Sequence, residues 1–182
     1  MKEKLIRQAV RSRFKLTSRA SALNQAGEWR DKYSQLAADL DAESGCIPVK
    51  VPPMLGVDED MREWSFFMLL EHNTIVNRSM TAIIESLANG QQVNTGPVKD
   101  PKTDVMPSEA PGIEQVELFR QSIDNHITTV DDLSELRGTG EYPHPLFGMF
   151  DAHKWNCMFS FHLQVHVKQA QFIAQKARSA PQ

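Results

Sequence analysis

Apolar residues recur at spacings of three and four along most of the chain, the periodicity of one face of an α-helix. This pattern predicts a first helix within residues 2–43, a second over 58–88, a third over 113–136 and a fourth over 151–177. Asp58 is the expected N-cap of the second helix, because Glu59 and Asp60 would follow it in the positively polarised first turn. The second half of the first helix carries the clearest stripe: Leu23, Ala26, Trp29, Tyr33, Leu36, Ala37 and Leu40.

Strand signals are weak. The β-branched stretch at 47–51 is interrupted by Pro48 and followed by Pro52 and Pro53, which argues against a strand. We therefore expect an all-α protein, a single-domain four-helix bundle covering residues 1–182. Residues 91–111 form a proline-containing connection long enough to travel the length of the bundle, so the predicted order is up-down-down-up, with this crossover between helices two and three.

Composition narrows the class of protein. The 182 residues are 41% hydrophobic and 24% charged, which excludes a disordered chain. The longest apolar stretch, residues 66–70, is too short to span a membrane, and the N-terminus lacks the apolar core of a secretory signal. Cys46 and Cys157 cannot form a disulfide framework, which favours a reducing, cytoplasmic location. We expect Cys157 to act as a small buried apolar residue.

Charge is unevenly distributed. Residues 1–20 hold seven basic groups and one acidic group, a net +6, whereas residues 21–182 carry a net −9. A solvated first helix explains the basic segment most simply, and an anionic partner or a membrane surface are the alternatives. A nucleic-acid partner is not expected, because the remaining chain is acidic and its basic groups do not alternate with aromatic residues.

Three histidines form the one constellation with recognisable chemistry. The chain has no P-loop, no GxSxG elbow, no GxGxxG and no HExxH motif. His162 and His166 are four residues apart, so their imidazoles lie on the same helix face and can reach one metal ion. His72 lies on the apolar stripe of the second predicted helix and also faces the core. The alternative is that these are core histidines satisfied by hydrogen bonds.

Three imidazoles with open coordination positions are typical of catalytic rather than structural metal sites. Zinc, nickel, iron and manganese would all accept these ligands, and ligand type does not choose among them. Gln169 follows His166 by three residues and could orient a ligand or line a pocket. Trp64 and Trp155 are expected to pack in the core and to line the pocket. No general acid or base can be identified.

The other histidines are expected to be structural. We predict that His144 stabilises a turn or helix end, that His126 lies at the surface or boundary, and that His153 is exposed at the start of the last helix. Glu71 should point away from the ligand set, towards the surface or the outer shell of the site.

Two segments carry a family resemblance. Residues 64–72, Trp-Ser-Phe-Phe-Met-Leu-Leu-Glu-His, resemble the second helix of the DinB-like superfamily. Residues 144–148, His-Pro-Leu-Phe-Gly, followed by Trp155 and by His162 to Gln169, resemble its HP-x-FG turn and HxxxHxxQ helix. The similarity covers about residues 20–178 and leaves the basic stretch 1–19 outside.

The resemblance implies an up-down-down-up bundle in which His72, His162 and His166 bind a divalent metal. It also implies metal-dependent hydrolysis, or group transfer using a low-molecular-weight thiol. A homodimer is expected on two grounds, the habit of this family and the long first helix. A non-catalytic bundle that binds a metal, a ligand or a partner remains the alternative.

Overall fold

The structure is a computed structural model that describes residues 2–179, with side chains described from Leu5 onward. Its described part is mostly helical, as the periodicity predicts. The helices are α1 (Lys2–Leu16), α2 (Arg19–Ala37), α3 (Phe66–Ala88), α4 (Glu114–Asp132) and α5 (Ala152–Arg178). Two short 3-10 turns, η1 (Ser44–Cys46) and η2 (Glu59–Met61), precede α3.

The single helix expected within residues 2–43 is instead two helices. α1 ends at Leu16, and Ser18 begins α2 by accepting a hydrogen bond from the Ser21 backbone N–H. A serine oxygen in this position satisfies one of the free donors of a helix start, so it favours a new helix over continuation of the old one. The stripe from Leu23 to Ala37 therefore belongs to a helix separate from the basic segment.

The boundaries of the next two helices also differ from the prediction. α3 begins at Phe66, where Ser65 is the N-cap and accepts from the Met68 backbone N–H. Asp58 instead precedes η2 and makes no side-chain capping hydrogen bond. α4 ends at Asp132, four residues before the expected end at Leu136. The last helix agrees with the prediction, because Asp151 caps α5 through the Lys154 N–H.

A small antiparallel sheet corrects the expectation of a purely helical chain. Strands β1 (Tyr142–His144) and β2 (Gly148–Phe150) pair with Tyr142 opposite Phe150. Gly148 has φ near +80°, a conformation that only glycine adopts without cost, and this lets the chain turn back after Phe147. The hairpin precedes α5 and packs its Phe150 into the core.

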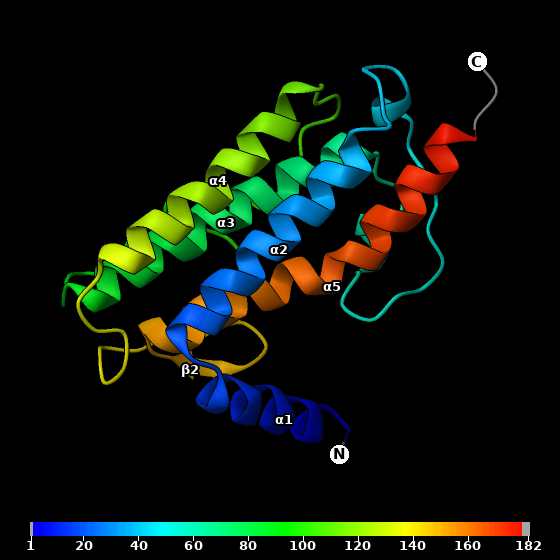
Figure 1. Cartoon of the computed structure of the whole chain (residues 1–182). Coiled ribbons are helices and arrows are strands. Elements are labelled where there is room, and N and C mark those ends of the chain that lie inside the picture. Colours follow the sequence, from blue (N-terminus) through cyan, green and yellow to red (C-terminus); the bar gives the residue numbers. More distant parts are fainter. Residues whose placement is uncertain (1, 180–182) are drawn as a thin grey trace.

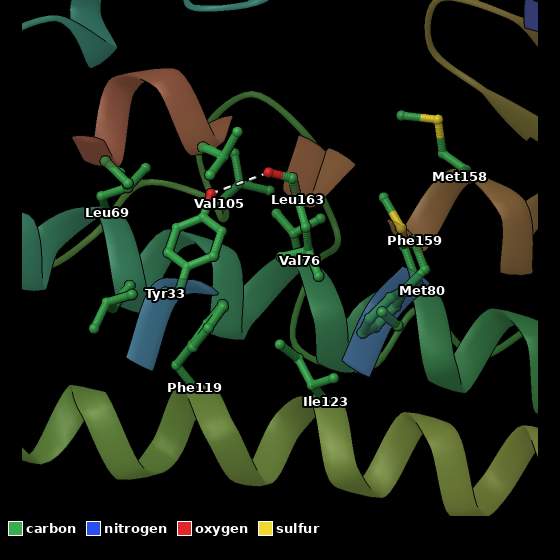
Figure 2. Close-up of a cluster of buried hydrophobic side chains, with 14 of the residues drawn as sticks. Tyr33, Leu69, Val76, Met80, Val105, Phe119, Ile123, Met158, Phe159 and Leu163 are labelled. Carbon is green, nitrogen blue, oxygen red and sulfur yellow. Dashed lines mark hydrogen bonds between the residues drawn. The ribbon is translucent and has the colours of Figure 1, made fainter. Parts of the chain in front are cut away.

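The four helices from α2 to α5 pack against one another, and the crossover of residues 91–111 connects α3 to α4. Figure 1 shows α2 and α5 running in roughly one direction and α3 and α4 in the opposite one. Their shared core contains Tyr33, Phe119 and Phe159, and the Tyr33 hydroxyl donates to the Leu163 carbonyl at 3.1 Å (Figure 2). Within residues 2–179, no helix combines the length and apolar content that crossing a bilayer requires.

Candidate metal centre

The fold brings His72 of α3 together with His162 and His166 of α5. Each offers one ring nitrogen, and the three nitrogens lie within 4.8 Å of one another. The ring centroids of His72 are 5.4 Å from His162 and 5.1 Å from His166. These three residues were expected from sequence to share a site, and we call them the histidine triad. The three nitrogens would hold one divalent metal ion if the side chains moved closer together.

His72 is held by the crossover. Its Nδ1 lies 2.7 Å from the Val105 carbonyl oxygen, which can only accept, so Nδ1 carries the proton. The neutral ring then has its lone pair on Nε2. That atom is buried and has no hydrogen-bond partner among the described residues. An unpaired buried acceptor is costly, and a metal ion would satisfy it.

His166 is oriented by Gln169 in a similar way. The Gln169 amide nitrogen donates to the Met61 carbonyl at 2.7 Å, which leaves the amide oxygen to accept from His166 Nδ1 at 2.9 Å. His166 Nε2 therefore keeps the lone pair. The expected orienting role of Gln169 thus has a geometric basis, and the chain of contacts extends to the loop before α3.

His162 is the most accessible member of the triad. His72 and His166 are each 2% exposed, whereas His162 is partly exposed. Its Nδ1 is nevertheless buried and unpaired among the described residues. The triad is therefore least enclosed on the side of His162.

The surroundings keep all three imidazoles neutral. Burial, reinforced by the neighbouring His166, lowers the pKa of His72 to about 3. Burial is also the main cause that lowers the pKa of His162 and of His166, with nearby histidines contributing at His162. Neutral imidazole is the form that binds metal, so the triad is ready to bind at neutral pH without losing protons.

The two tryptophans predicted to line the pocket differ in how they lie relative to the triad. Trp64 is buried and its ring lies 5.1 Å from the His72 ring, in agreement with a lining role. Trp155 is also buried, but its ring packs against those of Tyr142, Phe150 and His144, with the His144 ring at 5.2 Å. His144 accepts the Leu146 N–H at Nδ1 inside the hairpin, so it stabilises a turn rather than a helix end. Burial lowers its pKa to about 4.

The loop before α3 closes one side of the site. Gly56 has φ near +80°, and a Cβ built on it would come 2.5 Å from Val165 Cγ1, between the two histidines of α5. Asp58 lies close enough to His166 for its charge to oppose the lowering of the His166 pKa. Glycine at position 56 therefore permits the close approach that places Met61 against Gln169 and Asp58 near the triad.

Two histidine predictions are wrong. His126, expected at the surface or boundary, is completely buried between Thr81 and Asn156 and stacks on Phe159 at 3.5 Å. His153, expected to be exposed, is buried, and its Nε2 lies 2.7 Å from the Arg137 guanidinium and 3.1 Å from the Phe14 carbonyl oxygen. In both cases polar partners on other elements satisfy the ring, which periodicity along one helix cannot reveal.

Cys157 is a small buried residue, as expected. It lies 3.6 Å from His153 Nε2, but burial raises the pKa of its thiol to about 12. It is therefore a protonated thiol at neutral pH rather than a nucleophile.

Sequence reasoning missed the groups that orient the ligands. Val105 and Met61 act through backbone carbonyls, so their side-chain types gave no signal. Glu71 accepts from both the N–H and the hydroxyl of Ser108 at 2.8 Å, which fastens the crossover next to His72. The sequence pattern placed Glu71 away from the triad but did not identify this partner.

Comparisons of the chain with protein-family profiles, with curated proteins and with solved structures find no match. The histidine triad is therefore interpreted from its own geometry.

Proposed function

We propose that the histidine triad binds one divalent transition metal and that the protein is a metal-dependent enzyme. The observation that carries the proposal is the proximity of three neutral imidazole nitrogens, two of them with the lone pair fixed on Nε2 by a partner at Nδ1. Hydrogen-bond partners of this kind orient metal-bound histidines and raise their basicity.

The residues present fit the metal. Three neutral nitrogen donors suit zinc, nickel, iron or manganese, and the buried unpaired Nε2 of His72 lacks any other described partner. When bound, such a metal acts as a Lewis acid that lowers the pKa of water or of a thiol. The chain contributes a rigid ligand set, an approach from the His162 side, and Asp58 as a nearby carboxylate. Hydrolysis and transfer from a low-molecular-weight thiol are the two reactions that we propose.

The DinB-like superfamily is the family we propose for this chain. The spacing of His72, His162 and His166, the turn at residues 144–148 and the pairing of His166 with Gln169 support it. The helix directions in Figure 1 support an up-down-down-up four-helix bundle formed by α2 to α5, with the crossover between α3 and α4. In this arrangement, α1 is an addition outside the bundle.

Metal content measured by elemental analysis tests the site. We expect about one transition metal per chain in untagged wild-type protein and a severe loss in His72→Ala and His162→Ala. His153→Asn, which removes a buried histidine outside the triad, should retain the metal. Circular dichroism should show that all variants remain helical. Unchanged metal content in His162→Ala would mean that the triad is not the metal site.

A non-catalytic metal-binding protein is the second candidate, favoured by the 2% exposure of His72 and His166. The two candidates differ in whether a small molecule can reach the bound ion. Cobalt-substituted protein can be titrated with a small thiol and followed by its visible absorption. A new thiolate-to-cobalt band favours the enzyme, and an unchanged spectrum favours the closed site.

Homodimerisation is also proposed, from the family resemblance alone. The second reason, a long first helix, no longer applies because that segment is two helices. Small-angle scattering over a range of concentrations should give the mass of a dimer, and a constant monomer mass would remove the proposal.

A further inference from the structure

α1 lies across one end of the molecule, beside the β1–β2 hairpin (Figure 1). One side of the helix is fixed: Val10 and Phe14 are buried, and the Phe14 ring packs edge-on against Phe150 and Phe161 at 5.8 Å. Arg11 adds hydrogen bonds to the carbonyl oxygens of Phe147 and Met149. The orientation of α1 is therefore set, and a defined face points away from the protein.

The outward face combines exposed apolar residues in one stripe. At 100° per residue, Leu5, Ala9, Ser12 and Leu16 share the side of α1 opposite Val10 and Phe14. Leu5 is 62% exposed and Leu16 is 89% exposed. Of the eight large hydrophobic side chains that are exposed in the described part of the chain, five belong to α1 or the hairpin: Leu5, Ile6, Leu16, Leu146 and Met149. Such clustering at one end marks a surface that meets an apolar partner.

Basic groups lie on one side of this stripe. At 100° per residue, Lys15 and Ser12 adjoin it, and Arg11 and Arg7 follow farther round the helix, towards Phe14. Arg7, Arg11 and Lys15, together with Gln8 and Ser12, line a shallow hollow of about 330 Å³. Every one of these side chains can donate a hydrogen bond, and none is acidic. Among the side chains described, no carboxylate forms an ion pair with Arg7 or Lys15. The hollow is therefore suited to an anionic group such as a phosphate.

The rest of the protein carries a net charge of the opposite sign. Residues 21–182 carry a net −9, against +6 in residues 1–20. A broad anionic surface would repel the larger part of the molecule and attract the α1 end. The charge distribution would thus turn the α1 end towards an anionic surface as well as attract the protein to that surface.

We propose that the side of α1 that carries the hollow and the adjoining stripe docks on an anionic phospholipid surface, with phosphate groups in the hollow at Arg7 and Lys15 and with Leu5 and Leu16 entering the interface at its edge. Basic residues bordering exposed apolar ones are typical of helices that lie in the membrane interface. The exposed leucines favour lipid over nucleic acid, which would be met by basic and aromatic side chains instead. Because the apolar stripe is short, the binding is reversible and depends on salt.

Vesicle sedimentation with the full chain tests the proposal. We expect binding to vesicles of phosphatidylserine and phosphatidylcholine, no binding to phosphatidylcholine alone, and release at high salt. Arg7→Glu with Lys15→Glu should weaken binding at least about tenfold, since each basic residue near such a surface contributes about fivefold. Leu5→Ser with Leu16→Ser should also weaken binding while leaving its salt dependence intact.

A charge-matched control separates the α1 face from net charge. Arg78→Glu with Lys102→Glu makes the same change in total charge at exposed positions on α3 and the crossover, and it should leave binding unchanged. Equal loss in this control, equal binding to neutral vesicles, or tighter binding to a DNA duplex than to anionic vesicles would each overturn the proposal. The assay does not depend on the metal, so its outcome is independent of the proposed enzyme activity.

Discussion

At the scale of single residues, the triad depends on the atoms that select one tautomer for each ring. His166 presents Nε2 because Gln169 accepts at Nδ1, and Gln169 is itself turned by the Met61 carbonyl. His72 presents Nε2 because Val105 accepts at Nδ1. Such outer contacts fix both ring orientation and donor strength. The three histidines of the triad could be predicted from sequence because histidine carries a chemical signal, whereas a backbone carbonyl carries none.

Gln169→Leu should therefore weaken metal binding by roughly 10–100-fold. The substitution removes the acceptor that holds the His166 proton on Nδ1, while keeping a buried side chain of similar size. Competition with a chromophoric chelator measures the affinity. Gln164→Leu is the matched control, since Gln164 lies on the same helix and accepts from Arg13 instead of from the triad. Equal affinities in both variants and the wild type would show that the amide does not support the site.

The buried His126 shows how residues on several elements share one polar network. The Thr81 hydroxyl donates to the Asn77 carbonyl, so it accepts from His126 Nδ1. Neutral His126 then accepts at Nε2, where the Asn156 side-chain amide lies 3.0 Å away. The NH2 group of that amide has no other partner among the described residues. With the Asn156 amide turned by 180°, this NH2 group would donate a hydrogen bond to His126 Nε2.

At the scale of elements, irregular segments rather than helices complete the site. The helices bring the three histidines together, and their periodicity made this predictable. The loop of residues 54–61 and the crossover supply the groups that orient and cover them. Their placement depends on contacts with distant residues, such as Ser108 with Glu71, so pattern along the chain could not predict it. The break at residues 17–18 and the β1–β2 hairpin were missed because short polar or proline-containing segments have weak periodicity.

Gly56→Ala should loosen this covering loop. The substitution places a Cβ against Val165 in a backbone conformation that disfavours side chains, so the loop must move away from α5. We expect metal affinity to fall by about tenfold or more in the chelator assay, because Met61 would no longer hold Gln169. Gly90→Ala is the control: its φ is also positive, near +64°, but its Cβ would meet nothing within 4 Å. If both variants lose affinity equally, displacement of the loop is not the cause.

At the scale of the whole molecule, buried neutral histidines make stability depend on pH. Burial lowers the pKa of His126 to about 3, against an ordinary value of 6.5. The folded protein therefore stays unprotonated there, while the unfolded chain takes up a proton below about pH 6.5. Below pH 6.5 the unfolded state binds more protons than the folded state. The contribution of His126 to the free energy of unfolding is therefore fully present above pH 6.5 and is lost as the pH falls towards 3.

Denaturant unfolding of metal-free protein between about pH 7 and about pH 5 measures this effect, because most carboxylates remain ionised in that window. Each fully buried histidine should contribute a loss of up to about 1.4 kcal/mol per pH unit below 6.5. His126→Asn should be less stable at pH 7 but should show a smaller slope. A slope equal to that of the wild type would mean that His126 does not contribute to acid sensitivity.

The hydrogen bond between His72 and the Val105 carbonyl would affect how fast an ion at the proposed site exchanges. His72 and His166 are enclosed, so an ion at the proposed site could enter or leave on their sides only when the crossover or the loop before α3 opens. Exchange by these two routes would be limited by the frequency of local unfolding rather than by diffusion. Amide hydrogen exchange at residues 104–108 should slow when metal is bound, and slow release from a tight site would let the protein keep its ion while free metal in its surroundings fluctuates.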